Sequence, residues 1–382
     1  IFITYRANDV HGAHDPDYPG TADFKKAHPE YVVDPDDRSG DWMSRCLDYW
    51  RAEVRHYVLA SLEDLAARYD VDGFQIDWMR FPRHLSGKTG DEVWAKRGAL
   101  TSFMASVREV LDGTGSRSGR RPVLAARVPT WPQGCRWVGI DLAEWNRRGL
   151  IDFVTVAPFL STDFRIPFEQ FRRLLADHHV PVYAGADFCH SGRPHNPESL
   201  RAWALCMYGQ GADGLNIFNF PCWTEYLGAV PYHWLEGLHD TALLRGKPAL
   251  YPLVSTQHRV PGVDQPTPLP AAVPPGGTTR LTLYLPPDAL PARRAALLAC
   301  AGGDVGMAIN GAAVRERKSP RASELFTSHK TRELIEQEPA ADACRLFDFD
   351  RTVLHAGDNE IAVLNAGADA RTLVRLELGL WY

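Results

Sequence analysis

Aspartates at the ends of apolar segments are the residues of this sequence best suited to chemistry. Asp77 lies near the end of the segment GFQIDWM, and Asp187 lies near the end of VYAGADF. Because side chains alternate along a strand, Asp77 shares a face with Gln75, opposite Phe74 and Ile76. Two carboxyl groups on either side of a sugar could cleave a glycosidic bond, one as the acid and the other as base or nucleophile.

Asp77 is our first catalytic candidate, as nucleophile or base. For the acid we rank Asp187 first, then Asp163 and Asp9. A strand-end aspartate also commonly caps the next helix, and this alternative stays open for Asp77, Asp163 and Asp187.

Other polar or aromatic residues cluster near the ends of the same segments. Thr4, Arg6 and Asn8 share one face of the first segment, and Arg127 shares a face with Ala125. The predicted substrate-binding residues are Arg6, Asp9, His11, Trp78, Arg80, Arg127, Trp131, Asn219 and Trp223. The arginines would keep Asp77 ionised or bind an anionic sugar, and Arg127 could instead neutralise a buried acid. The tryptophans could stack on sugar rings or belong to the core.

A loop after the first segment suggests a different chemistry. The sequence VHGAHDPDYP groups His11, His14, Asp15 and Asp17, which could bind a divalent ion and support a hydrolase or lyase. The spacing matches no defined motif, and a polar loop rich in turn formers is the alternative. We therefore assign no metal site and predict no cofactor.

The elements that must position these residues alternate between strand and helix up to about residue 250, which predicts an α/β fold with a parallel sheet. The predicted strands are Phe2–Asn8, Gly73–Met79, Val123–Val128, Phe153–Phe159, Val182–Phe188 and Gly214–Phe220. The predicted helices are Asp48–Tyr69, Val93–Leu111, Pro167–Ala176 and Pro197–Gln210. A closed (β/α)₈ TIM barrel needs eight strands, so we expect two further units before residue 1; an open doubly wound sheet is the alternative.

The composition and hydrophobic pattern of the sequence change after about residue 250. Residues 251–278 are rich in Pro, Gly and Thr, which indicates a linker or domain entry. Short alternating segments follow: Thr279–Leu285, Ala295–Cys300, Val305–Ile309, Arg345–Phe349, Asn359–Leu364 and Thr372–Leu380. They predict a small all-β sandwich or jelly roll over residues 279–382, after a catalytic domain over residues 1–250.

Composition excludes several classes of protein. The 382 residues carry a net charge of −5 and no basic run, so nucleic acid is not an expected partner. No apolar stretch reaches the ~20 residues of a membrane span.

The seven cysteines form no CxxC pair, which argues against a zinc ribbon. Their odd number argues against a disulfide framework, although one buried disulfide stays open. The chain opens on Ile1 without a leader, and we expect its true start to lie upstream.

The segment RYDVDGFQIDWMRFPRH carries a family resemblance. It resembles the fourth-strand region of the bacterial glycosyl-hydrolase-like family 10 proteins, where a strand of the form DGIHFDDYRYP follows a long helix. FITYRAND, AHPEYVVD, RPVLAARVPTWP and LAEWNRRGLIDFVTVAPFLS are similar to further segments of that family, in the same order. The resemblance covers residues 1–220 and implies a TIM-barrel carbohydrate-active enzyme, with a periplasmic or extracellular location favoured.

The resemblance also assigns roles to residues and leaves gaps. It makes Asp77 the strand-end acid, whereas the second acidic position of the family is Trp78 here. The Asn-Glu-Pro motif of many barrel glycosidases is absent, which excludes an acid–base glutamate at this strand. In several families with such an aspartate the acid follows the sixth strand, which keeps Asp163 as a candidate beside Asp187.

Two C-terminal segments, VGMAINGAAV and LHAGDNEIAVLNAG, are similar to parts of galactose-binding jelly rolls. A purely structural sandwich is the alternative. The sequence thus predicts a glycoside hydrolase that cleaves a poly- or oligosaccharide by paired carboxylates. A non-catalytic glycan-binding barrel and a metal-assisted hydrolase or lyase remain as alternatives. Two inward carboxylates about 5–10 Å apart would favour the enzyme, and one aspartate among arginines would favour binding.

Overall fold

The computed structural model describes residues 2–15, 17–224, 228–256, 259–317 and 344–382. It contains two compact units that are interleaved along the chain. Unit 1 comprises residues 1–159, 167–183 and 260–265, and unit 2 comprises residues 160–166, 184–259 and 266–382. Residues 318–343 of the predicted C-terminal domain lie outside the described residues.

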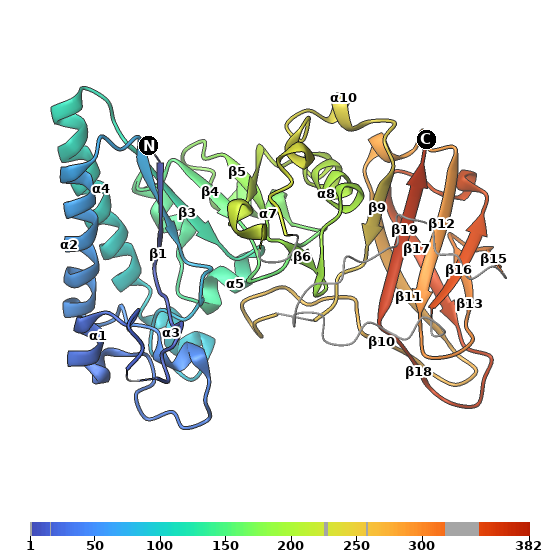
Figure 1. The fold of residues 1–382 in the computed structure, drawn as a ribbon, viewed down its shortest axis with the longest axis horizontal. Coiled ribbons are helices and arrows are strands. Elements are labelled where there is room, and N and C mark those ends of the chain that lie inside the picture. Colours follow the sequence, from blue (N-terminus) through green and yellow to red (C-terminus); the bar gives the residue numbers. More distant parts are fainter. Residues whose placement is uncertain (1, 16, 225–227, 257–258, 318–343) are drawn as a thin grey trace. The chain divides into compact units, whose positions relative to one another are not determined.

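The N-terminal region is a parallel α/β half-barrel, followed by antiparallel β-sheets, as the sequence predicts (Figure 1). Its sheet has the order β1-β2-β3-β4-β5-β8, which follows the chain. The strands are β1 (Phe2–Arg6), β2 (Gly73–Asp77), β3 (Val123–Val128), β4 (Phe153–Val156), β5 (Val182–Ala186) and β8 (Gly214–Ile217). Five of the six end two or three residues earlier than predicted, because the chain leaves the sheet where the loops begin.

Helices follow the strands of the half-barrel. They are α1 (Asp23–Ala27), α2 (Ala52–Arg68), α3 (Gly90–Ala95), α4 (Gly98–Ser118), α5 (Pro132–Trp137), α6 (Leu142–Arg147), α7 (Phe168–Leu174), α8 (Pro197–Gly209) and α10 (Thr241–Leu244). In unit 1, α2 and α4 pack side by side (Figure 1). α2 buries Val54, Val58, Leu62 and Ala66, a spacing of four that forms one apolar stripe. The predicted helix Val93–Leu111 is two helices, because the chain bends at Lys96, the C-cap of α3.

The inner face of the sheet in unit 1 changes from aromatic to polar along the strands. Near the start of β1, Phe2 stacks on Phe153 with ring centroids 5.8 Å apart. The ring of Phe2 lies over Gly73, where an added Cβ would meet it at 2.6 Å, so only glycine fits there. One layer higher, Gln75 donates a hydrogen bond of 2.9 Å to the Thr155 hydroxyl.

The next layer is charged. The register pairs Arg6 with Asp77 and Asp77 with Arg127, so three charged residues of adjacent strands lie at one level. This level is the C-terminal end of β1 and β2, where barrel enzymes carry their active sites.

Antiparallel sheets form the C-terminal part of unit 2. One has the order β11-β17-β13-β14, and the other has the order β15-β16-β12-β19-β9. Their strands are β9 (Ala249–Pro252), β11 (Thr278–Leu285), β12 (Arg294–Cys300), β13 (Gly306–Ile309), β14 (Ala312–Ala313), β15 (Arg315–Glu316), β16 (Cys344–Phe349), β17 (Gly357–Leu364) and β19 (Arg375–Trp381). A further pair joins β10 (Ala271–Val273) and β18 (Arg371–Leu373). The predicted strand Thr372–Leu380 is divided between β18 and β19, and β9 and β10 were not predicted.

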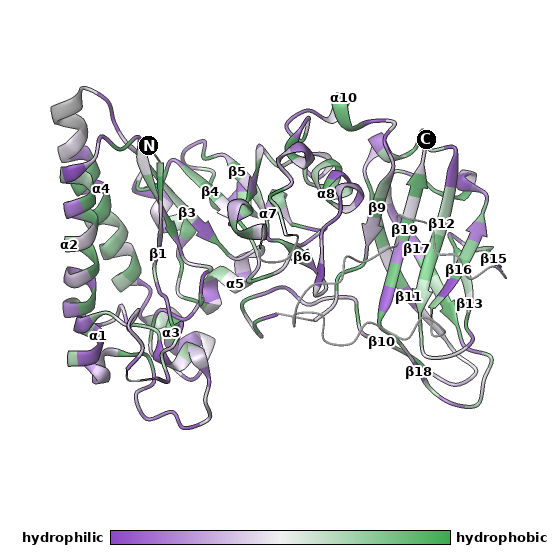
Figure 2. Ribbon diagram, in the orientation of Figure 1, coloured by the Kyte–Doolittle hydropathy of each residue, from purple (hydrophilic) through white to green (hydrophobic). Residues whose placement is uncertain are grey.

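A disulfide and an apolar core hold the larger C-terminal sheet together. Cys300 of β12 is bonded to Cys344 of β16, the one bridge that the sequence leaves open. Leu250, Leu298 and Leu346 pack together in this core. Figure 2 shows β12 as largely hydrophobic, whereas α2 carries both hydrophobic and hydrophilic residues along its length. Among the described helices, none is long and apolar enough to cross a membrane.

Candidate functional site

Asp77 ends β2 and is completely buried. Its Oδ1 accepts hydrogen bonds from the main-chain N–H groups of Met79, at 2.9 Å, and Arg80, at 3.1 Å. The same oxygen accepts a third bond from Arg127, at 3.0 Å. The other oxygen, Oδ2, is buried and has no hydrogen-bond partner among the described residues. The carboxylate is therefore fixed through one oxygen only.

Arg127, from the end of β3, is 1% exposed and is the charge partner of Asp77. Its guanidinium also donates to the main-chain oxygen of Pro158, at 3.2 Å. An arginine fork held at two points cannot rotate away from the acid, so the pair is preorganised.

The turn after Asp77 is backbone-strained. Phe81 has a φ of 55°, which is rare for a bulky residue and costs roughly 1–3 kcal/mol. Its buried ring packs with Val10, Val33 and Cys46. The guanidinium of Arg80 lies 5.1 Å from the centre of this ring. Packing of Phe81 therefore holds a strained turn directly behind the aspartate, as is common near functional sites.

Trp78 lies on the face of β2 opposite to Asp77. It is fully buried, and its ring contacts Tyr49, Phe103 and Trp145. Such an aromatic surrounding is typical of a core residue, the alternative that the sequence leaves open for Trp78, and its role in substrate binding stays a prediction.

A buried hydrogen-bond network of Asn8 and His84, called the latch below, joins the loops after β1 and β2. The Asn8 side chain accepts a bond of 2.7 Å from the Leu47 N–H and donates to His84 Nδ1, at 3.2 Å. His84 Nε2 in turn donates to the main-chain oxygen of Trp78, at 2.7 Å. Burial lowers the pKa of His84 to about 4, although the bond to Trp78 and the charge of Asp77 oppose this shift. The imidazole is thus neutral, with its proton on Nε2.

Four of the predicted binding residues form an exposed chain at the same end of the sheet. Asp9 Oδ2 accepts from Arg6 at 3.0 Å, and Asp9 Oδ1 accepts from His11 Nδ1 at 2.6 Å. His11 Nε2 lies 3.4 Å from the guanidinium of Arg80. Burial raises the pKa of Asp9, but the hydrogen bonds from His11 and Arg6 outweigh it and keep the pKa below its ordinary value. Asp9 therefore presents an ionised carboxylate at the surface.

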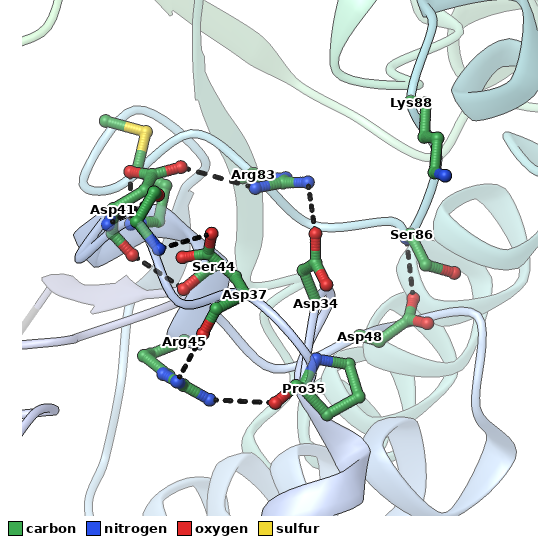
Figure 3. Close-up of polar contacts among 12 residues, drawn as sticks. Asp34, Pro35, Asp37, Asp41, Ser44, Arg45, Asp48, Arg83, Ser86 and Lys88 are labelled. Atoms are coloured by element: carbon green, nitrogen blue, oxygen red, sulfur yellow. Dashed lines mark hydrogen bonds and ion pairs between the residues drawn. The ribbon is translucent and has the colours of Figure 1, made fainter.

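The loop that contains Asp34, Asp41 and Asp48 binds the segment after β2 through ion pairs and a hydrogen bond (Figure 3). Arg83 forms ion pairs with Asp41, at 3.4 Å, and Asp34, at 3.9 Å. The Ser86 N–H donates to Asp48, at 3.1 Å. The aspartates of this loop therefore form ion pairs with arginine or accept hydrogen bonds from main-chain N–H groups.

The other two predicted acids lie in unit 2. Asp163 is buried and forms an ion pair with Arg259 at 2.5 Å. Asp187 is 3% exposed, and its Oδ1 accepts from the N–H of Phe188 at 2.8 Å. Asp77 belongs to unit 1, so its predicted pairing with either acid stays a prediction.

A hydroxyl–imidazole chain supports the end of β5 in unit 2. The Thr162 hydroxyl lies 3.1 Å from both the N–H and the oxygen of the Asp187 main chain. His195 Nε2 lies 3.0 Å from the same hydroxyl, and its Nδ1 lies 2.9 Å from Ser199 Oγ. Burial lowers the pKa of His195 to about 3, so it is neutral. Sequence reasoning missed this chain, although the segment DFCHSGRPHN between a strand and a helix is conspicuously rich in histidine and arginine.

The remaining aromatic and amide candidates are distributed over both units. In unit 1, the indole of Trp131 donates to the main-chain oxygen of Val263, at 2.8 Å. In unit 2, Trp223 is 1% exposed and stacks parallel to His195, with ring centroids 6.1 Å apart. Asn219 follows β8 with a left-handed φ of 49° and is partly exposed. Trp223 is thus a core residue of unit 2, whereas Asn219 is reachable from solvent.

The loop proposed for a metal does not gather its ligands. Over the described residues, no group of three or more His, Cys, Asp or Glu side chains could hold a metal ion. His11 is instead bonded to Asp9, and Asp15 accepts from the main chain of Asp17, at 2.9 Å.

Comparison with known proteins identifies no family. No family model matches the chain. No curated protein matches it either.

The structure has distant similarity to glycoside hydrolase TIM-barrel domains. One is a glycoside hydrolase family 18 N-acetylglucosaminidase from Paenibacillus barengoltzii, with 22% identity and a TM-score of 0.28, over 37% of this chain and 46% of that chain. A second is the catalytic domain of a psychrophilic chitinase B from Arthrobacter TAD20, with 13% identity and a TM-score of 0.32, over 44% and 61%. A third is the PgaB (BpsB) glycoside hydrolase domain from Bordetella bronchiseptica, with 15% identity and a TM-score of 0.31, over 46% and 60%. The chain therefore spans less than two thirds of the length of each of these three proteins.

Proposed function

We propose that this protein acts on carbohydrate as a glycoside hydrolase, with Asp77 as nucleophile or base. The observation that carries the proposal is the asymmetry of the Asp77 carboxylate. Three donors hold Oδ1, whereas Oδ2 is buried without a hydrogen-bond partner among the described residues.

Burying a carboxylate oxygen without a hydrogen-bond partner lowers the free energy of unfolding. A buried acceptor without a partner costs about 1–3 kcal/mol, and native proteins keep few of them outside functional sites. A carboxylate that is fixed through one oxygen and has the other available is suited to attack an anomeric carbon or to take a proton from water. The resemblance of RYDVDGFQIDWMRFPRH to the glycosyl-hydrolase-like family 10 strand supports the same role for Asp77.

The second carboxyl group must come from elsewhere, because Trp78 occupies the family's second acidic position. Asp9 carries a lowered pKa, whereas a general acid near neutral pH needs a raised one. Asp9 therefore suits an ionised role in binding, and Asp187 and Asp163 remain our candidates for the acid. We also keep the proposed division into a barrel over residues 1–250, a linker over 251–278 and a β-domain over 279–382.

The test is sugar release by the full chain and by Asp77→Asn on a panel of neutral and acidic glycans. The amide keeps an oxygen for the N–H groups of Met79 and Arg80 but cannot act as nucleophile or base. We expect a loss of about a thousandfold or more in the rate. Equal rates for the parent and the folded variant would reject the catalytic role.

A control is needed because the variant leaves Arg127 buried without its anion. The double variant Asp77→Asn/Arg127→Met removes both charges and should restore folding stability. If the double variant is stable and still inactive, the loss of activity is chemical. If it recovers activity, Asp77 acts only through the ion pair.

A non-catalytic glycan-binding barrel is the second candidate, and burial favours it. Asp77 is 0% exposed, so a sugar reaches Oδ2 only if neighbouring side chains move. The side chains of Arg6, Asp9 and His11 are 35%, 45% and 42% exposed and could contact a sugar directly. Binding of a glycan from the panel by a parent that releases no sugar from any of them would favour this function.

A further inference from the structure

A pocket of about 320 Å³ opens beside the exposed chain of unit 1, a volume at the lower end for small-ligand sites. It is lined by residues of β1, the following loop, α1 and α2. Among them are Arg6, Asp9, His11, Tyr18, Lys25 and Tyr57. The pocket thus includes Arg6, Asp9 and His11 of the exposed chain together with residues of α1 and α2, and Asp77 does not line it.

Its walls are built from fixed aromatic rings. The ring of Tyr18 lies against Gly12 and Gly20, where an added Cβ would meet it at 2.2 Å and 2.6 Å. Gly12 also has a φ of 64°, so this position needs glycine for its backbone as well. Tyr57 of α2, which also lines the pocket, stacks on Phe24 of α1, with ring centroids 4.0 Å apart. This contact fixes the helix that carries Lys25.

The charges of the pocket leave one cation without an anion. Arg6 and Asp9 neutralise each other in their ion pair. Lys25 has one hydrogen bond among the described residues, from Nζ to the main-chain oxygen of Asp9 at 3.5 Å, and no carboxylate partner there. Burial lowers the pKa of Lys25, and the nearby Cys46 and Asp9 oppose the shift only in part. A bound anion would supply the missing partner.

We infer that this pocket binds a sugar residue that carries a carboxylate, such as a hexuronic acid, with Lys25 on the carboxylate and Tyr18 against the ring. The inference rests on the proposed function, since it names the class of sugar that the same site would take. Aromatic rings suit the C–H face of a pyranose, and an ammonium group forms strong charge-assisted hydrogen bonds with a carboxylate. A neutral sugar would leave the Lys25 charge unpaired in a half-buried position.

The experiment measures binding of D-glucuronate and D-glucose to the full chain by titration calorimetry at low salt. We expect glucuronate to bind at least about tenfold more tightly than glucose, the effect of one charge-assisted hydrogen bond. Lys25→Met should remove most of this preference, and Lys25→Arg should retain it. Lys26→Met is the matched control, because Lys26 is the exposed neighbour on α1 and does not line the pocket.

Three results would overturn the inference: no binding of glucuronate, equal affinity for both sugars, or a preference that survives Lys25→Met. Thermal unfolding of each variant verifies that the protein is folded. Binding needs no turnover, so these results are independent of sugar release. A parent that binds glucuronate but releases no sugar would contradict the hydrolase proposal and leave the pocket assignment standing.

Discussion

Asp77 of unit 1 and Glu377 of unit 2 are both buried against arginine, and the two arrangements use the carboxylate differently. In unit 2, Glu377 of β19 is completely buried between two arginines. Its Oε1 accepts from Arg193 and its Oε2 accepts from Arg375, both at 2.8 Å. In unit 1, Asp77 has one arginine, and one of its oxygens has no hydrogen-bond partner among the described residues.

The difference separates a structural ion group from a candidate reactive one. Burial raises the pKa of Glu377, but the charges of Arg193 and Arg375 and their hydrogen bonds outweigh it, so the pKa is lowered. Both oxygens are occupied, so this carboxylate has no atom left for a ligand. Asp77 is held as firmly, through three donors to one oxygen, yet keeps its second oxygen. Full burial is common to the two carboxylates, and they differ in the number of oxygens that accept a hydrogen bond from a described residue.

The largest effect we expect on stability is from Glu377→Gln. Removing one partner of a buried ion group costs about 3–5 kcal/mol, because the remaining charge stays buried without compensation. Here two guanidinium groups would lose their anion. Urea unfolding of the full chain measures the loss in free energy of unfolding.

The matched control is Glu360→Gln, which breaks an exposed pair with Arg280. An exposed ion pair contributes little, so this variant should unfold like the parent. Equal losses for Glu377→Gln and Glu360→Gln would contradict a structural role for the buried group.

The second prediction concerns how each charge group can be repaired. Asp77→Asn should lose stability because Arg127 stays charged, and Asp77→Asn/Arg127→Met should recover about 2 kcal/mol of that loss. For Glu377→Gln the addition of Arg193→Met should recover less, because Arg375 keeps its charge. Urea unfolding of the four variants gives both differences. A double variant at Asp77 that is no more stable than the single one would argue against a simple one-to-one pair.

Local sequence pattern was sufficient to predict the strands of the half-barrel and the face of β2 that carries Asp77. The alternation in GFQIDWM predicts that Asp77 shares a face with Gln75, and Gln75 donates to Thr155 on the inner face. The same rule applied one residue further places Trp78 on the opposite face, where the structure packs it among aromatic rings. This packing agrees with the core alternative that the sequence leaves open for Trp78, and its role in substrate binding stays a prediction.

Long-range partners are the part that local pattern could not predict. The hydrogen bonds that the Asp77 carboxylate accepts depend in part on Arg127, which is 50 positions away in the sequence. The chain from Thr162 to His195 spans 33 positions and joins two loops. β9 was missed for the same reason, since this short strand forms its pairs with β19, far along the chain.

The smallest expected effect is a pH dependence that comes from the latch beside Asp77. His84 is buried and neutral, and its pKa of about 4 lies below the ordinary value of 6.5. The unfolded chain therefore takes up a proton first, and stability falls as the pH drops below about 6.5 and continues to fall to about 4. Between pH 6.5 and 5.5 this histidine should cost about 1 kcal/mol. Urea unfolding across this range, compared with His84→Gln, isolates the contribution from those of His190 and His195. Parallel curves for the parent and His84→Gln would mean that His84 already binds its proton in the folded state, and the latch from Asn8 to Trp78 would then not hold as described.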